Sequence, residues 1–146
     1  YGRECPPAQQ ITFCYGARNA ELLAGVDDFE QIGVNTQICT DDGSAGVQGL
    51  VTEVLEQVLQ TDAAAHGSNQ GVQVVCCGPE PMMEAVAKVA QRWSVPCQVS
   101  LETPMACGIG ICFSCVTRCK ESDGSWDYKR TCVDGPVFDA EKIFWD

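Results

Sequence analysis

The chain has 146 residues, a length typical of one domain with at most a small appended module. Its formal charge is -11, and this excess of carboxylates argues against nucleic acid or an anionic membrane surface as a partner. Hydrophobic residues make up 45% and charged residues 20%, which are ordinary values for a globular domain and exclude a disordered chain or a coiled coil.

The cysteine content is unusual and bears on the compartment. Eleven cysteines cannot all pair with one another, and the first ten residues lack the basic-then-apolar pattern of a secretory signal. No segment approaches the roughly 18 consecutive apolar residues that a membrane span needs. We therefore expect a soluble protein of the reducing cytoplasm.

The first half of the chain reads as alternating strands and helices. Residues 11–15 and 34–39 have the β-rich, alternating pattern of strands. Residues 19–29 have helical spacing between them, although Gly25 makes this helix short or irregular. Residues 47–59 have the apolar period of an amphipathic helix, and residues 61–71 form a polar loop.

The same alternation continues to residue 101 and then stops. Residues 72–77 and 97–101 read as strands, and residues 82–93 as a helix whose start is marked by Pro79 and Pro81. This order predicts an α/β fold with a parallel sheet. From residue 105 a Gly- and Cys-rich loop leads into short β-like pieces. We expect an α/β domain over 1–103 and a small β-containing module over 104–146.

Four cysteines of the second module have a distinctive spacing. Cys107, Cys112, Cys115 and Cys132 form C-x4-C-x2-C-x16-C, and the first three match the run that binds plant-type [2Fe-2S] clusters. Gly108 and Gly110 would let the loop pass close to a cluster and turn amides toward its sulfur atoms. Thiolates also suit iron chemically.

Two alternatives remain open at this point. A structural zinc site usually presents two short cysteine pairs, whereas here the last cysteine stands alone. Cys119 could replace Cys132 as the fourth ligand, although packing is its simpler role. The remaining cysteines fall on predicted strands or in the N-terminal segment, where a free thiol acts as a small hydrophobe: Cys5, Cys14, Cys39, Cys76 and Cys97.

Basic residues gather near these cysteines. Residues 118–130 hold four of the nine Lys and Arg residues and carry a net charge of +1, which leaves -12 for the rest of the chain. Cations beside an anionic cluster would raise its potential, because they stabilise the charge gained on reduction. A solvated hairpin with ordinary ion pairs is the alternative explanation.

Three loops follow predicted strands and are expected at one edge of the sheet, where ligands of α/β folds bind. One is a strand-to-helix turn whose amides could meet an anion. Another carries two carboxylates, which would accept hydrogen bonds from ribose hydroxyls and favour NAD over NADP; an acidic surface turn is the other interpretation. The loops are Cys77–Met82, Tyr15–Arg18 and Thr40–Ser44.

The motifs CGPEPM, SLETPMACGIGICFSC and TCVDGPVF resemble the electron-transfer subunit of NAD-linked dihydroorotate dehydrogenase, in the ferredoxin reductase superfamily. The resemblance covers nearly the whole chain. It implies a [2Fe-2S] cluster held by Cys107, Cys112, Cys115 and Cys132. It also implies an NAD site, with the nicotinamide side at Cys77, Gly78, Pro79 and Met82, and the ribose and adenine side at Gly16, Ala17, Arg18, Asp41, Asp42, Gly43 and Ser44.

The resemblance implies an oxidoreductase subunit of pyrimidine biosynthesis that relays electrons to a catalytic dihydroorotate-oxidising flavoprotein. No residue of the chain then has to act as a general acid or base, and His66 is expected on the surface. Related ferredoxin-linked subunits tend to have Asp at the position of Cys107, so this cysteine favours the dihydroorotate interpretation. A hydrogenase or sulfur reductase complex and a zinc-stapled interaction module are the alternatives.

Family members begin with a flavin-binding barrel, a strand and a Gly-rich phosphate loop, none of which precedes Ile11 here. We therefore expect similarity to the C-terminal part of such a subunit, in a truncated form or a fragment. FAD would belong to the full-length protein and not to this chain. The chain alone would bind NAD weakly and would not be active by itself.

Overall fold

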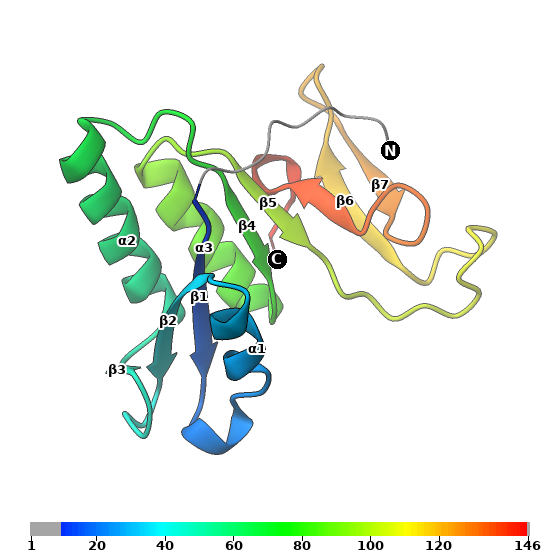
Figure 1. The fold of residues 1–146 in the computed structure, drawn as a ribbon. Helices are drawn as coiled ribbons and strands as arrows, with labels where there is room; N and C mark the ends of the chain where they lie inside the picture. The colour runs from blue at the N-terminus through cyan, green and yellow to red at the C-terminus, as the bar shows by residue number, and fades with distance from the viewer. Residues whose placement is uncertain (1–9, 146) are drawn as a thin grey trace. The chain divides into compact units, whose positions relative to one another are not determined.

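The structure is a computed structural model that describes residues 10–145. Within these residues the strands form three sheets. Their orders are β1-β2-β3, β4-β5-β8 and β6-β7 (Figure 1). The chain divides into two compact units between Val58 and Leu59. The expectation of an α/β fold with parallel strands is confirmed, whereas Cys5 lies outside the described residues.

The first unit is a small parallel sheet with short helices. Strands β1 (Thr12–Ala17), β2 (Asn35–Thr40) and β3 (Val47–Gln48) run parallel, with Ala17 opposite Thr40. Between β1 and β2 the chain forms a 3-10 turn η1 (Ala20–Leu22) and helix α1 (Val26–Gln31). Gly25 separates them at a φ of 67°, so the expected irregularity of this segment is confirmed.

Helix α2 (Val51–His66) corrects two boundaries predicted from the sequence. The predicted helix began at residue 47, but Val47–Gln48 pairs with β2 and Gly49 turns the chain at a φ of 145°. The predicted loop began at residue 61, but three consecutive alanines prolong the helix to His66. Alanine has the highest helix propensity, and this outweighs the polar residues around it.

The second unit contains β4 (Val74–Cys77), α3 (Glu80–Arg92) and β5 (Cys97–Ser100). β4 and β5 are parallel, and α3 packs on both. The apolar stripe of α3, which includes Met83, Val86 and Ala90, is buried as the sequence predicts. Pro81 lies in the first turn of α3, where its missing N–H has no partner to lose.

The second unit also holds the predicted β module. Strands β6 (Val116–Lys120) and β7 (Trp126–Arg130) form an antiparallel hairpin. Strand β8 (Val137–Asp139) then pairs antiparallel with β5, and η2 (Ala140–Lys142) follows. The chain after the predicted boundary at residues 103 and 104 therefore returns to the sheet, and that boundary stays a prediction.

Within residues 10–145, the structure contains no helix long and apolar enough to cross a bilayer.

Candidate metal centre and nucleotide loops

The four cysteines singled out by spacing form two thiol pairs. The Cys112 thiol donates a hydrogen bond to Cys107 Sγ over 3.1 Å. The Cys132 thiol is hydrogen-bonded to Cys115. Cys107 also interacts electrostatically with both members of the second pair. The fold therefore brings together one pair from the loop and one pair that joins the loop to the end of β7.

Backbone amides stabilise thiolates at this centre. Hydrogen bonds from the amide of Ile109, the thiol and amide of Cys112 and the amide of Ile111 lower the pKa of Cys107 to about 6. The amide and the thiol of Cys132 lower the pKa of Cys115. Cys132 has a raised pKa, because its thiol donates to Cys115. Cys107 and Cys115 thus favour the thiolate, which is the form of cysteine that binds metal.

Two glycines give the loop its path, as the sequence predicts. Gly108 and Gly110 have φ values of 66° and 82°, a region that other residues rarely occupy. A Cβ on Gly110 would lie 2.4 Å from Val133 Cγ2, so a side chain there would displace the turn that follows Cys132. Gly110 also directs its amide to Cys132.

The thiols that the sequence singles out lie in two pairs and not in one group of three or four. A zinc ion needs three or four ligands around one point. Among residues 10–145, no three His, Cys, Asp or Glu side chains surround a common point in this way. Two pairs of thiols, in contrast, match a [2Fe-2S] group, in which each iron takes two cysteine ligands.

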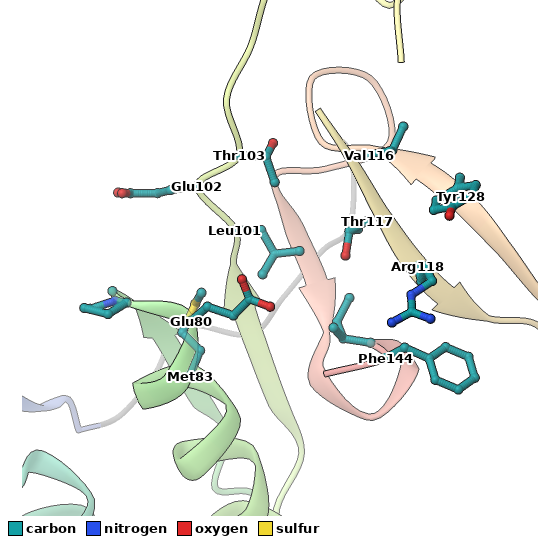
Figure 2. A pocket seen from close by; sticks show the side chains of 13 residues that line it. Glu80, Met83, Leu101, Glu102, Thr103, Val116, Thr117, Arg118, Tyr128 and Phe144 are labelled. Atoms are coloured by element: carbon teal, nitrogen blue, oxygen red, sulfur yellow. The ribbon is translucent and has the colours of Figure 1, made fainter. Parts of the chain in front are cut away.

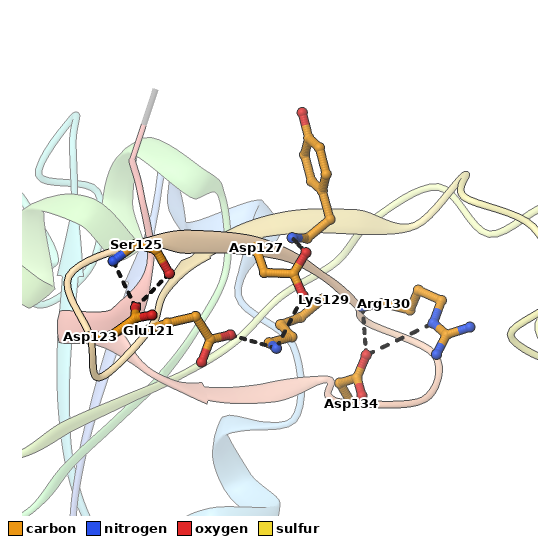
Figure 3. A network of polar contacts seen from close by, with 8 residues as sticks. Glu121, Asp123, Ser125, Asp127, Lys129, Arg130 and Asp134 are labelled. Atoms are coloured by element: carbon orange, nitrogen blue, oxygen red, sulfur yellow. Dashed lines mark hydrogen bonds and ion pairs between the residues drawn. The ribbon is translucent and has the colours of Figure 1, made fainter.

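The end of β7 attaches the loop to the hairpin. Arg130 Nη1 donates to the Gly110 carbonyl over 2.6 Å, and the Thr131 amide donates to the Cys115 carbonyl over 2.8 Å. Figure 3 shows the ion pairs around this strand, with Lys129 between Glu121 and Asp127 and with Arg130 beside Asp134. Lys129 therefore forms a hairpin ion pair, as the second explanation of the basic segment expects. Arg130 reaches the cysteine loop, and an effect of these cations on a cluster potential stays a prediction.

The other cysteines have a different environment. Cys119 lies in β6, opposite Asp127 and bridged to Ile143, and it is buried. Burial is the main cause that raises the pKa of this thiol and of Cys14, Cys39, Cys76 and Cys97. These thiols are neutral packing groups, as the sequence predicts for small hydrophobes.

In the first unit, the loops after β1 and β2 lie side by side. The Asp41 amide donates to the Ala17 carbonyl over 3.1 Å, and the Asp42 amide donates to the Arg18 carbonyl over 3.3 Å. Asp42 Oδ1 accepts the Ser44 hydroxyl at 2.5 Å and its amide at 2.9 Å, and these bonds lower the pKa of Asp42. The Ser44 oxygen accepts the Ala20 amide. Two of the three predicted ligand loops therefore meet at one sheet edge. Gly16 belongs to the first of them and Gly43 to the second.

The third loop, after β4, borders a cleft of about 470 Å³ in the second unit. Gly78 and Pro79 line it together with Glu80 and Met83 of α3, which Figure 2 labels. Cys77 and Met82 do not line the cleft: Cys77 Sγ faces Glu102 Oε1 at 4.0 Å, and Met82 lies against Gly78. The convergence of all three loops stays a prediction, since this loop belongs to the other unit.

The sequence did not predict the opposite wall of this cleft. Residues of the hairpin and the C-terminal segment form it, with Arg118, Tyr128 and Phe144 among them (Figure 2). The Phe144 amide donates to the Arg118 carbonyl over 3.0 Å, and the Arg118 guanidinium lies 5.9 Å from the centre of the Phe144 ring. No periodic pattern links these positions in the sequence, because the contact arises only when the segment after β8 folds back on β6.

His66, the one histidine, lies exposed at the end of α2 and contacts only Asp62 among the interactions described, with Nδ1 and Oδ1 3.2 Å apart. This place agrees with the expected surface position.

A thiolate-rich loop with directed amides, set on a β hairpin next to an α/β layer, defines an iron–sulfur protein. Comparisons with known proteins refine this class. Residues 102–144 match the family described as the iron-sulfur cluster binding domain of dihydroorotate dehydrogenase B. This segment contains all four paired cysteines.

Curated relatives extend the match over most of the chain. It is 38% identical, over 94% of its length, to the dihydroorotate dehydrogenase B (NAD(+)) electron transfer subunit of Caldanaerobacter subterraneus subsp. tengcongensis, of which the match covers 51%. The probable subunit of Methanocaldococcus jannaschii is 40% identical over 92% of this chain and 46% of its own length. The resemblance to this group of electron-transfer subunits is therefore confirmed, and the chain spans about half the length of the curated relatives it matches.

A solved structure supports the fold. The structure of an NADH-dependent reduced ferredoxin-NADP oxidoreductase has a TM-score of 0.70 and 33% identity, and the match covers 94% of this chain and 45% of that chain. This likeness agrees with the ferredoxin-reductase type of α/β layer that the sequence motifs indicate.

Proposed function

We propose that this chain is an electron-transfer component of a dihydroorotate-oxidising complex in pyrimidine biosynthesis. Cys107, Cys112, Cys115 and Cys132 would hold a [2Fe-2S] cluster, which when bound would supply one-electron transfer between an NAD and flavin site and a catalytic flavoprotein. The pairing of four thiols, two for each iron, carries this proposal. The isolated chain is an oxidoreductase subunit that is not active by itself.

The roles of the residues follow from the pairing. Cys107 and Cys112 hold one iron, and Cys115 and Cys132 hold the other. When bound, the cluster supplies storage for one electron at a time. The chain favours the thiolate of Cys107 through the amides of Ile109, Ile111 and Cys112. It needs no general acid or base, because it positions and tunes cofactors that carry the chemistry.

The two loops of the first unit are the proposed ribose side of an NAD site. Asp42 Oδ1 is already hydrogen-bonded to Ser44, so Asp42 mainly shapes the loop. Asp41 is exposed and is the better acceptor for ribose hydroxyls. Gly78 and Pro79 at the cleft are the proposed nicotinamide side, together with Cys77 and Met82.

We expect the isolated chain to bind NAD weakly or undetectably, because the expected Gly-rich phosphate loop is missing from the described strands and turns. FAD belongs to the longer protein in this proposal. Titration calorimetry with NAD on the 146-residue chain measures this directly. A dissociation constant in the low micromolar range would contradict the argument, and Asp41→Ala serves as the control for binding at the proposed ribose side.

In this proposal, the loop that carries Cys107 and Cys112 is the docking surface for the flavoprotein partner. Large apolar side chains are exposed there, with Ile109, Ile111 and Phe113 each more than 70% accessible. Such a patch is unusual on a free surface and typical of protein interfaces. A partner seated on it would lie directly over the cysteine ligands. We define the apolar patch by the residues Met105, Ile109, Ile111, Phe113 and Val133.

Cytoplasmic location is also part of the proposal. Each cysteine between residues 10 and 145 is free, which agrees with a reducing compartment.

The test of the cluster uses ligand variants of the chain purified without oxygen. We expect visible absorption that bleaches with dithionite in the native chain, its loss in Cys132→Ser, and its retention in Cys119→Ser. Cys119 is the matched control because it is also a cysteine of the β module but is buried beside Ile143. Colour kept in Cys132→Ser and lost in Cys119→Ser would show that the fourth ligand is Cys119. Colourless protein with stoichiometric zinc would support the zinc-stapled module instead.

A second candidate keeps the electron relay but changes the partner. Similarity to the reduced ferredoxin-NADP oxidoreductase structure favours it, because that structure matches as much of the chain as the dihydroorotate dehydrogenase subunits do. Pull-down of the cluster-loaded chain with purified flavoprotein candidates decides between them. Binding to a dihydroorotate-oxidising flavoprotein supports the first proposal, and binding only to a ferredoxin-linked, hydrogenase or sulfur reductase subunit supports the second.

A further inference from the structure

Thr131 is a fully buried residue whose hydroxyl has no hydrogen-bond partner. Its exposed fraction is 0%, and no protein atom described in residues 10–145 lies within hydrogen-bonding reach of Oγ1. A buried polar group without a partner costs about 1–3 kcal/mol, so native proteins rarely keep one without a reason. The position of Thr131 suggests what satisfies this hydroxyl.

Thr131 is connected to both cysteines of the second thiol pair, Cys115 and Cys132. Its backbone amide donates to the carbonyl of Cys115 over 2.8 Å, and the next residue is Cys132. Both neighbours are proposed ligands of the same iron. The residue before it, Arg130, is hydrogen-bonded to Gly110 of the loop, so the backbone around Thr131 is fixed on both sides. The backbone thus fixes Thr131 between the two proposed ligands of this iron, while no described protein atom, sulfur included, is a hydrogen-bond partner of Oγ1.

We propose that Thr131 Oγ1 donates a hydrogen bond to sulfur at the Cys115–Cys132 side of the bound cluster and thereby raises its reduction potential. The inference rests on the proposed [2Fe-2S] cluster. Sulfur that ligates or bridges iron is anionic and accepts hydrogen bonds, and these bonds tune the potential of iron–sulfur groups. A donor stabilises the reduced state more, because reduction adds negative charge to the sulfur atoms. Thr131 is therefore a positioning and tuning residue, not a ligand.

The decisive variant is Thr131→Val, which replaces the hydroxyl by a methyl group of similar size. In the cluster-loaded 146-residue chain we expect a lower midpoint potential in an optical redox titration. The reduction equilibrium should change about tenfold, which is about 59 mV for one electron. Thr131→Ser keeps the hydroxyl and should restore the native potential. The Fe–S stretching bands in the resonance Raman spectrum should shift in Thr131→Val and not in Thr131→Ser.

A second measurement uses the cluster-free chain and a matched threonine. Thr40 is also 0% exposed, but its hydroxyl donates to the Ala45 carbonyl over 2.8 Å. We expect Thr40→Val to lower the denaturation midpoint and leave the potential unchanged. Thr131→Val should not lower the midpoint, because its hydroxyl loses no partner.

Three outcomes distinguish the proposals. A native chain that takes up no iron and sulfide refutes the proposed function itself. Cluster-loaded Thr131→Val with the native potential and native Raman bands refutes only the hydrogen bond. A lower denaturation midpoint of cluster-free Thr131→Val, equal to that of Thr40→Val, would show that the hydroxyl stabilises the protein fold. This outcome also refutes the proposed hydrogen bond to the cluster.

Discussion

Cysteine has two opposite roles in this chain, and backbone polarity decides between them. In the loop, amides of Ile109 and Ile111 point at Cys107 and lower its pKa, so the thiolate forms near neutral pH. On the strands, burial disfavours the thiolate and raises the pKa of Cys76 to about 12 and of Cys97 to about 11. The thiolate is therefore favoured at Cys107, which amides reach, and disfavoured at the thiols buried on strands.

The strand thiols predict a specific dependence of stability on alkaline pH. Burial, followed by the nearby Cys97 and Cys77, raises the pKa of Cys76 from 9.0 to about 12. The native state thus holds the proton more tightly than the unfolded state. The resulting stabilisation is complete below pH 9 and is lost as the pH rises towards 12.

Denaturant titrations between pH 8 and 11, a range of roughly three units over which the thiol of an unfolded chain ionises, test this. As the pH rises, the free energy of unfolding should fall less steeply in Cys76→Ala than in the native chain. Cys77→Ala is the control: it should reduce the fall only slightly, because Cys77 is exposed and raises the pKa of Cys76 less than burial does. An equally steep fall in Cys76→Ala and the native chain would contradict the role of burial.

At the scale of elements, the end of β7 determines the geometry of the metal centre. Arg130 connects the strand to the Gly110 carbonyl, while Gly110 in turn directs its amide to Cys132. The loop that holds Cys107 and Cys112 is attached in this way to the strand that ends beside Cys132. The hairpin therefore connects the loop that carries Cys107 and Cys112 to the pair formed by Cys115 and Cys132.

Arg130→Met should release this attachment and make the cluster less stable. We expect cluster loss in the presence of an iron chelator, followed by visible absorption, to be several times faster than in the native chain. Lys129→Met is the matched control: it removes the same charge from the same strand, but Lys129 pairs with Glu121 and Asp127 of the hairpin. Equal rates in both variants would mean that charge, and not the contact with Gly110, stabilises the cluster.

Elements with a strong local signal were predictable, and boundaries decided by competition were not. The break at Gly25 and the proline start of α3 follow from backbone constraints that hold in any context. The start of α2 was wrong because Val47–Gln48 gains a partner strand, which no local pattern shows. Its end was wrong because the helix propensity of alanine outweighs the polar residues near it.

At the scale of the whole molecule, the apolar patch around the cluster is the feature that calls for a partner. Ile111 is 78% exposed and Ile109 is 72% exposed, and both lie between cysteine ligands. Apolar side chains at the centre of an interface usually contribute most of the binding energy. A one-electron carrier also needs its acceptor close to the ligands, so in the proposed function the same patch would serve binding and electron transfer.

Ile111→Ser should therefore weaken binding of the flavoprotein partner by about tenfold, which corresponds to about 1.4 kcal/mol. Surface plasmon resonance with the cluster-loaded chain measures this. Ile32→Ser is the control, since Ile32 is 74% exposed but lies after α1, outside the apolar patch. Equal affinities of the two variants would mean that the partner binds outside the apolar patch. The visible spectrum should stay native in both variants.

The sequence alone singled out the four thiols as candidate ligands, because three of them have the short spacing of a loop-bound cluster, with glycines between the first two, and a distant fourth cysteine follows. It also placed the ligand loops after strands, since strand and turn signals are local. Tertiary structure decided which thiols pair, that Arg130 and Thr131 lie beside them, and that Arg118 and Phe144 form the far wall of the cleft. These features depend on β8 returning to β5 and on the C-terminal segment meeting β6, contacts between residues far apart in the chain that no short motif encodes.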